Sequence, residues 1–257
     1  TPMAADWVAL EGVLGRRRRD LFPIINGADY GEWNPETDRA LPARYSGKNL
    51  AGKAVCRERL IREAGLQASP SSPVVGMVSR ITSQKGFDLF LQAAPRLLER
   101  ESAFVILGEG EESLQRGLKE LERAFPRRIR VILGFDEGLA HRIIAGSDYS
   151  LLPSRFEPAG LTQVYSLRYG TLPIVRAPGG LDDTIEEFNP RARTGNGFKF
   201  SAPTPAALAA AVVSAFSHYR VSPRWERLRL NALSADFSWE RPSARYEEVY
   251  REALRRL

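Results

Sequence analysis

Residues 74–86 read VVGMVSRITSQKG, and this stretch decides the fold. Its first five residues, Val74 to Val78, form a short apolar run that is typical of a buried strand. A polar loop follows, and then an amphipathic stretch at 86–99 that predicts a helix. A strand, a loop and a helix in this order form the beginning of a βαβ unit in a parallel sheet.

The same alternation continues outward from this stretch to the C-terminus. Short apolar runs predict further strands at 103–107, 129–133, 149–152, 172–175 and 197–200. Helices are predicted at 53–65, 111–124, 137–145, 160–169, 204–219, 223–233 and 241–256, and the rest of residues 1–70 is irregular. These features predict an α/β fold with a doubly wound parallel sheet that helices cover on both faces. Ligands of such a sheet bind at the carboxyl ends of the strands.

The composition describes a globular chain with an excess of positive charge. The 257 residues carry a formal net charge of +6. Such a charge is compatible with nucleic acid, an anionic surface or an anionic small substrate as the partner. The run Arg16 to Arg19 has no interleaved aromatic residues, which favours a solvated surface over a nucleic-acid patch. No apolar run approaches the roughly 18 residues that a membrane span needs, so we expect neither nucleic acid nor membrane as a partner.

The cysteine count and the first residues bear on the location and the extent of the chain. Cys56 is the single cysteine, so an intrachain disulfide is excluded, which suits a reducing compartment. The start, Thr1 to Asp6, has neither an initiator Met nor a signal-peptide pattern. We therefore expect a cytoplasmic protein, or a plastid one if the source is a plant, and a chain cut from within a longer protein.

Two cations follow the first predicted strand. Arg80 and Lys85 lie five residues apart, just before the start of a predicted helix. Arg holds phosphate oxygens in a bidentate fork, and Lys adds a point charge. The start of the helix adds N–H donors and a partial positive charge. The pattern favours a phosphate-binding loop, and a pair of surface cations is the alternative.

A second polar loop, residues 153–162, follows the fourth predicted strand. A carboxylate at Glu157, just ahead of a helix, is suited to holding sugar hydroxyls through charge-assisted hydrogen bonds. Gly160, Leu161 and Thr162 offer N–H groups and one hydroxyl to a phosphate. The alternative interpretation is that Glu157 only caps the helix.

Glycine-rich turns end three other predicted strands, at 108–110, 134–135 and 178–184. Gly134 lets the backbone approach a ligand, and Phe135 offers a ring that stacks on a base. A phenylalanine of the core explains Phe135 equally well. Several such loops at one sheet edge, together with the two cations, predict a diphosphate site with a sugar beside it.

Neither histidine is predicted to be catalytic. His141 lies on a predicted helix and His218 near the end of another, and their spacing does not suggest a pair. We expect both to be packed or surface residues. Metal-ligand spacing is absent, so no protein-bound metal is expected.

Five segments of the chain resemble the motifs of one enzyme family. They are Asn26 to Tyr30 with Trp33 to Pro35, Ser79-Arg80 with Lys85 to Leu89, Ser154 to Pro173, Pro178 to Thr184, and Asp236 to Trp239. Together they resemble the bacterial glycogen synthases and plant starch synthases, glycosyltransferase family 5. The stretch 154–173 is the most specific of the five.

The resemblance implies a Rossmann-like domain that forms the C-terminal, donor-binding half of a GT-B fold. It implies transfer of glucose from ADP-glucose to an α-1,4-glucan, with retention of configuration and without a cofactor. Arg80 and Lys85 would neutralise the donor diphosphate and stabilise the leaving ADP, and Glu157 would contact the donor glucose. The other donor-binding residues that it implies are Gly134, Phe135, Ala159, Gly160, Leu161 and Thr162.

The resemblance also implies a missing half. Residues 1–20 would be a remnant of the interdomain region, 21–235 the nucleotide-sugar-binding domain, and 236–257 a helix that packs on the absent N-terminal domain. The α-1,4-glucan would bind through that domain, so this chain alone is expected to be inactive. Phe135 stands where the family usually has Tyr, and Ala159 where many members have Cys.

Three other functions remain open. The chain resembles less closely other retaining GT-B glycosyltransferases, of the mannosyl- or sucrose-phosphate type. It is also compatible with an isolated nucleotide-sugar-binding module. Its charge alone is compatible with a nucleic-acid binder, which salt-dependent binding to any duplex would distinguish from the others.

Overall fold

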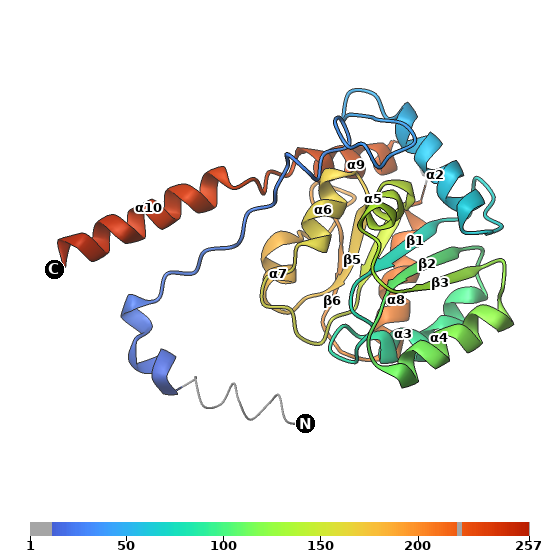
Figure 1. Cartoon of the computed structure of the whole chain (residues 1–257), viewed down its shortest axis with the longest axis horizontal. Coiled ribbons are helices and arrows are strands. Elements are labelled where there is room, and N and C mark those ends of the chain that lie inside the picture. The colour runs from blue at the N-terminus through green and yellow to red at the C-terminus, as the bar shows by residue number, and fades with distance from the viewer. Residues whose placement is uncertain (1–11, 220–222, 257) are drawn as a thin grey trace. The chain divides into compact units, whose positions relative to one another are not determined.

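The computed structural model describes residues 12–219 and 223–256 (Figure 1). By its internal contacts the chain divides into two compact units. The core unit consists of residues 28–237, and the terminal unit combines residues 1–27 with 238–257.

The core unit is built on a six-stranded sheet whose neighbouring strands are all parallel. Its order is β3-β2-β1-β4-β5-β6, so the chain winds outward from β1 in one direction and then returns to wind outward in the other. The strands are β1 Val74–Val78, β2 Ala103–Gly108, β3 Ile129–Leu133, β4 Tyr149–Leu152, β5 Leu172–Arg176 and β6 Phe198–Phe200. The predicted strands and the doubly wound α/β fold are thereby confirmed.

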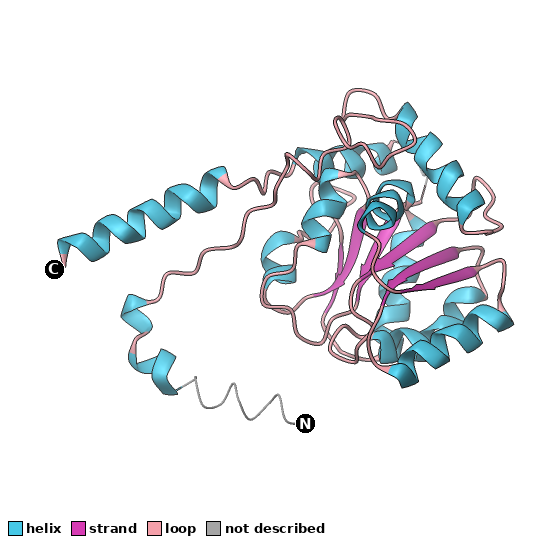
Figure 2. Ribbon diagram, viewed as in Figure 1, coloured by secondary structure: helices cyan, strands magenta, loops and turns pink. Residues whose placement is uncertain are grey.

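Helices follow the strands, as the alternation of the sequence predicts (Figure 2). They are α2 Ala51–Glu63, α3 Phe87–Leu98, α4 Glu112–Ala124, α5 Glu137–Gly146, α6 Thr162–Arg168, α7 Gly180–Thr184, α8 Pro205–Ser217, α9 Arg224–Ser234 and α10 Glu240–Arg255, with a 3-10 turn η1 at Arg18–Asp20. Helices α3, α4 and α8 cover one face of the sheet, and α2, α5 and α6 lie on the other. No helix in the described part of the chain is both long and apolar enough to cross a membrane.

Successive apolar side chains along each strand point to opposite faces of the sheet and pack against the helices on both. In β2, Phe104 faces the cluster around α3, where its ring lies 5.4 Å from that of Phe90. The next residue, Val105, belongs to a second cluster together with Leu60 of α2 and Ile143 of α5. Because both faces are covered, the strands are apolar at nearly every position, which is why the sequence shows them as continuous apolar runs.

Residues 28–50, which are irregular in sequence, are held onto the core unit by buried polar and aromatic contacts. Asp38 is buried, and one of its carboxylate oxygens lies 2.7 Å from His141 Nδ1 and 2.5 Å from the Tyr169 hydroxyl. Burial alone would raise the pKa of Asp38, but these hydrogen bonds and one from the Ala40 N–H hold it below its ordinary value. The Trp33 ring stacks on His141, with 3.7 Å between ring centroids. Of the two situations expected for His141, packed or at the surface, the structure shows the packed one.

The two ends of the core unit meet. The Ala28 N–H donates to the Phe237 carbonyl at 2.7 Å, and the Tyr30 hydroxyl accepts from the Phe237 N–H at 3.0 Å. Two segments that the sequence singled out near opposite ends of the chain, at 26–30 and 236–239, are therefore neighbours.

The terminal unit contains the last helix and the segment before the core unit. The missing side chain of Gly27 makes room for Trp239, because a Cβ there would lie 2.6 Å from the Trp239 Cα atom. Asp20 and Arg256 form an ion pair of 2.8 Å. Helix α10 has no buried residue, and the side chains of Tyr246 and Tyr250 are exposed.

Candidate functional site

Sequence-predicted residues from two loops gather where the strand order reverses. Strands β1 and β4 are neighbours, and the chain leaves them towards opposite sides of the sheet. A cavity of about 100 Å³ lies at their carboxyl ends. Its lining includes Lys85 from the β1–α3 loop, and Glu157 with 160–162 from the β4–α6 loop. The crevice at such a switch point is where doubly wound sheets bind ligands.

The β1–α3 loop reaches the cavity because a glycine lets it pass close to the β4–α6 loop. Gly86 has a φ of 77°, and a Cβ on it would lie 2.1 Å from the Pro153 carbonyl oxygen. Two residues earlier along the loop, the Gln84 carbonyl accepts a hydrogen bond of 2.8 Å from the Arg155 N–H. The two loops are thus fixed against each other, and Lys85 faces the second loop.

Lys85 and Glu157 form an ion pair between Nζ and Oε2. Glu157 is buried, and the same carboxylate oxygen accepts a hydrogen bond of 3.3 Å from the Ser154 hydroxyl. The N-cap residue of α6 is Leu161, and no side chain caps that helix. The interpretation of Glu157 as a helix cap is therefore wrong. Its charge faces the cavity and the ammonium group.

The turn from Ala159 to Thr162 is held in place by contacts with Gly180 and Gln163. The Gly180 N–H donates to the Glu157 carbonyl at 3.1 Å, and a Cβ on Gly180 would lie 2.1 Å from the Ala159 carbonyl oxygen. Gln163 is fully buried, and its Nε2 donates to the carbonyls of Ala159 and Gly160 at 3.0 Å each. These contacts give the turn one backbone conformation.

Arg176, at the end of β5, is a residue that sequence reasoning missed. Its Nη1 donates to the carbonyls of Ser154 at 3.2 Å and Arg155 at 2.6 Å, and its Nε donates to the Ser201 carbonyl at 2.9 Å. Burial and, secondarily, the charge of Arg155 lower its pKa. Arg176 thereby holds the backbone that leads into Glu157. A lone arginine that ends an apolar strand was the signal available in the sequence.

The remaining predicted site residues lie outside the lining of this cavity. Arg80 is exposed, and no partner of its guanidinium is found in the part of the chain that the structure describes. Phe135 is 83% exposed, so its interpretation as a core phenylalanine is wrong. Gly134, with φ 121°, is tied by its N–H to the Gly108 carbonyl at 3.1 Å. Ala159 is half-buried.

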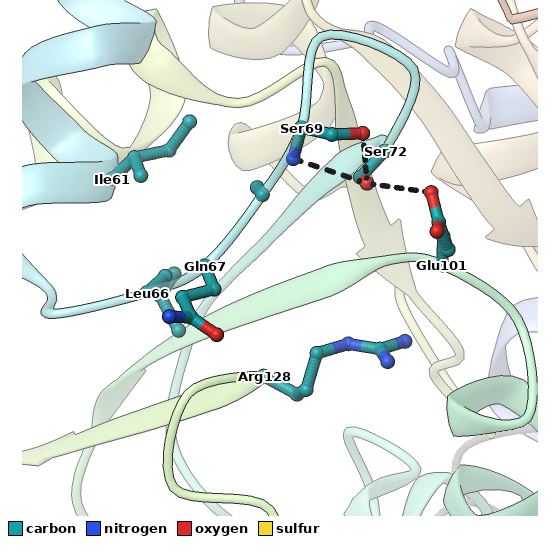
Figure 3. A pocket seen from close by; sticks show the side chains of 8 residues that line it. Ile61, Leu66, Gln67, Ser69, Ser72, Glu101 and Arg128 are labelled. Atoms are coloured by element: carbon teal, nitrogen blue, oxygen red, sulfur yellow. Dashed lines mark hydrogen bonds between the residues drawn. The ribbon is translucent and has the colours of Figure 1, made fainter.

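A larger cavity of about 540 Å³ lies at the opposite, amino ends of the strands (Figure 3). Several of its polar side chains bind one another or the local backbone. The Ser72 hydroxyl donates to Glu101 at 3.4 Å, and Arg128 Nε donates to the Ser102 carbonyl at 2.5 Å. These contacts join the β1, β2 and β3 ends, which is a structural role. We therefore place the candidate site at the smaller cavity.

Comparison with known proteins identifies the family to which this fold and this site correspond. The model of the family "Glycosyl transferases group 1" matches residues 61–231. Over 95% of this chain, the sequence is 48% identical to a glycogen synthase of Anaeromyxobacter sp. strain Fw109-5, of which it covers 51%. The chain thus spans about half the length of the relatives that it matches.

Solved structures are similar to different degrees. The catalytic domain of Arabidopsis thaliana starch synthase IV, bound to ADP and acarbose, superposes with a TM-score of 0.89 at 36% identity. The alignment covers 95% of this chain and 51% of that one. Sucrose-phosphate synthase from Thermosynechococcus elongatus aligns with a TM-score of 0.59 at 20% identity, over 79% of this chain and 49% of that one. At that identity the likeness concerns the fold alone.

Proposed function

The chain belongs to the group 1 family of glycosyl transferases, and from this premise we propose that it is the donor-binding half of a retaining glucosyltransferase. The proposed donor is ADP-glucose, and the proposed acceptor is the end of an α-1,4-glucan, as in glycogen and starch synthesis. The observation that carries the proposal is the pairing of Lys85 with Glu157 beside a cavity at the strand-order switch. It brings a cation for a phosphate and a carboxylate for a sugar to one place.

In this proposal the diphosphate of the donor binds to Lys85 and Arg80. Phosphate oxygens compete with Glu157 for the Lys85 ammonium, and the exposed Arg80 guanidinium is free of any intramolecular ion pair among the described residues. Both cations stabilise the negative charge that develops on the departing ADP. Such electrostatic stabilisation is usually the largest contribution to catalysis of this kind.

The glucose of the donor contacts Glu157. Its side chain is buried at the edge of the cavity. Hydrogen bonds from sugar hydroxyls to a carboxylate are strong because one partner is charged. Ser154 and Arg176 support this assignment, since one binds the carboxylate and the other fixes the backbone beside it. The backbone at 160–162 lines the same cavity and offers N–H groups to the donor phosphate, with Ala159 next to it in the sequence.

The base of the nucleotide stacks on Phe135. A phenylalanine that is 83% exposed leaves a large apolar face in water, and stacking of a flat base would cover that face. Gly134 lets the backbone come close to the base, because it has no side chain and a φ of 121°.

The glucan acceptor is proposed to bind mainly to a complementary domain. The chain covers about half of its glycogen synthase relatives, and its last helix exposes Tyr246, Tyr250 and Leu254 on successive turns. We propose that residues 21–235 act as the donor domain and that the helix within 236–257 packs on the complementary domain, with residues 1–20 as an interdomain remnant. A row of exposed apolar side chains is typical of an interface.

Binding of nucleotides to the chain tests the proposal. Calorimetric titration with ADP, ADP-glucose and UDP should show that the two adenine nucleotides bind in the same site, since each displaces the other. Tighter binding of UDP than of ADP would favour a glycosyltransferase of another donor class. Absence of binding of all three nucleotides would overturn the proposed function.

A further inference from the structure

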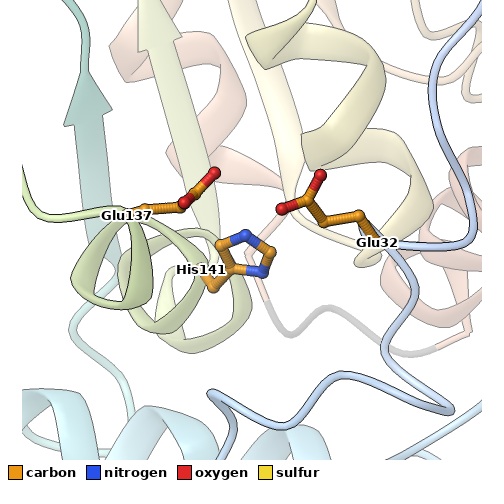
Figure 4. Close-up of side chains that lie close together, drawn as sticks. All are labelled: Glu32, Glu137 and His141. Atoms are coloured by element: carbon orange, nitrogen blue, oxygen red, sulfur yellow. The ribbon is translucent and has the colours of Figure 1, made fainter.

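A second cluster of chemically active side chains lies away from the donor cavity (Figure 4). Glu32, Glu137 and His141 each place a ligand atom within 4.8 Å of the others. Glu32 comes from the segment before α2, and the other two lie one helical turn apart on α5. A cavity of about 560 Å³ opens over them, and it shares no residue with the donor cavity.

The hydrogen bond of His141 fixes which ring nitrogen carries its lone pair. Its Nδ1 lies 2.7 Å from an oxygen of Asp38, and a carboxylate accepts, so Nδ1 is the donor. With Nδ1 engaged by Asp38, Nε2 is the ring nitrogen that is left to bind a metal. A carboxylate behind a histidine is the usual support of a metal-binding imidazole.

The second ring nitrogen has no partner in the described ranges 12–219 and 223–256. The His141 side chain is 6% exposed, and Figure 4 shows that one ring nitrogen points between the two glutamate carboxylates. Within the same ranges, neither Glu32 nor Glu137 has a Lys or Arg nitrogen within ion-pair distance. Two carboxylates and a lone pair that face one another without a cation repel, which a bound cation would relieve.

We propose that Glu32, Glu137 and His141 bind a divalent transition-metal ion of the Zn²⁺ class. One imidazole nitrogen and two carboxylate oxygens are a ligand set for Zn²⁺, which binds each at about 2.0–2.2 Å and keeps a further position for water. Ligand atoms on one tetrahedral ion lie about 3.3 Å apart, so the exposed glutamate side chains have to close by rotation. Mg²⁺ is disfavoured, because it prefers an octahedron of oxygens.

The ion would join residues 28–50 to helix α5. Glu32 is the ligand from that segment, and Trp33 beside it already stacks on His141. Metal binding to the folded chain would therefore raise its unfolding temperature. The sequence-based expectation of no metal rested on spacing alone. Glu137 and His141 are four residues apart on one helix, and the third member of the cluster, Glu32, reaches them only through folding.

The experiment is calorimetric titration of the tag-free 257-residue chain with ZnCl₂, MnCl₂ and MgCl₂. We expect one equivalent of Zn²⁺ to bind, with Mn²⁺ weaker and Mg²⁺ weakest. The variant Glu32→Gln/Glu137→Gln changes exposed side chains only and should weaken Zn²⁺ at least tenfold. Asp38→Asn should weaken it about 10- to 100-fold, the usual effect of losing a support behind a ligand. The matched control, Glu112→Gln/Glu120→Gln on α4, should bind Zn²⁺ as the parent chain does.

Nitrogen NMR of the rings supplies a readout that does not depend on activity. The chain has two histidines, so Zn²⁺ should shift the ring signals of His141 and leave those of His218 in place. Unchanged Zn²⁺ affinity in the double glutamate variant, a shift of His218 instead, or preference for Mg²⁺ would overturn the proposal. So would a parent chain that binds no stoichiometric Zn²⁺. ADP binding should be the same in the parent and the double variant, which separates this site from the proposed donor site.

Discussion

At the scale of single residues, the pairing of Lys85 with Glu157 couples two roles that the sequence assigns separately. Lys85 and Glu157 form an ion pair, so the buried carboxylate has a cationic partner beside its cavity. A diphosphate that takes the Lys85 ammonium leaves Glu157 free for hydroxyl donors of the sugar. Under the proposed function, binding of the phosphate end of the donor would therefore prepare the sugar end.

Loss of either cation should weaken nucleotide binding. We expect Arg80→Ala and Lys85→Ala each to lose about 1.5–3 kcal/mol of ADP binding, which is roughly a 10- to 150-fold increase in Kd. Calorimetry on the chain measures this change. Arg96→Ala, an exposed arginine of α3, is the control and should bind ADP normally. A double variant of Arg80 and Lys85 with the parent affinity would remove the phosphate assignment.

Removal of the Glu157 charge should affect turnover far more than nucleotide binding. In a protein that carries both halves, Glu157→Gln should lower kcat by at least about 100-fold, because the lost contact strengthens as the sugar bond breaks. Inhibition by ADP should change little, since Lys85 keeps its charge. If kcat stays within a few-fold of the parent value, Glu157 has no role in the reaction.

At the scale of elements, the site depends on how closely its loops approach. The β1–α3 loop passes the β4–α6 loop at Gly86, and the β5–α7 turn passes it at Gly180. Arg176 then links the end of β5 to the same loop. Contacts from the ends of two other strands, β1 and β5, therefore fix the conformation of one loop, and a change in either should reach Glu157.

Two glycine substitutions separate backbone conformation from loop approach. Gly65 and Gly86 both have positive φ, 65° and 77°, but a Cβ on Gly65 has open space while one on Gly86 meets the Pro153 carbonyl at 2.1 Å. Gly65→Ala should cost about 1–2 kcal/mol of unfolding free energy from the left-handed backbone alone. Gly86→Ala should cost more, and it should also weaken ADP binding. Equal costs in urea unfolding, with normal ADP binding, would contradict this account of the loops.

Asp38 makes the attachment of residues 28–50 sensitive to acid. Its folded-state pKa lies below the ordinary value of 3.8, so the unfolded chain takes up the proton first. The stabilisation of the folded chain by Asp38 is fully present above pH 3.8 and is lost as the pH falls through the lower folded-state pKa. Asp38→Asn should therefore be less stable than the parent near pH 7, by about 1–3 kcal/mol, and should lose less stability on acidification. Urea unfolding between pH 3 and 7 tests this, with the exposed Asp183→Asn as the control.

At the scale of the whole molecule, the chain holds the proposed donor loops and about half the length of its relatives. Transfer to a glucan requires donor and acceptor in one closed site from which water is excluded. A half that binds only the donor has no means of orienting the acceptor. Its last helix, α10, exposes apolar side chains that would be buried against a complementary domain.

We therefore expect no incorporation of glucose from ADP-glucose into glycogen by this chain alone. Addition of the N-terminal half of a relative, in cis or as a second chain, should restore it. Tyr246→Ser/Tyr250→Ser should leave the unfolding free energy of the chain within about 0.5 kcal/mol but should reduce the restored activity. Arg245→Ala/Glu248→Ala removes only an exposed ion pair of the same helix and serves as the control. Robust synthesis by the purified chain would contradict the two-half proposal.

The strands and the Lys85–Glu157 loops could be predicted because their signals are local. A strand covered on both faces is an apolar run, and its carboxyl end marks where a ligand binds. Arg176 and Asp38 were missed for the opposite reason. Arg176 acts on carbonyls of a different loop, and Asp38 on His141 more than a hundred residues away, so no short stretch of sequence shows either contact.

The hydrogen bond from Ala28 to Phe237 has a topological consequence. The first and last residues of the core unit are therefore neighbours, and the chain enters and leaves the unit at the same place. Domains whose ends lie together tolerate circular permutation and insertion into a host loop. A unit of this kind can therefore be exchanged between proteins by recombination as one intact module.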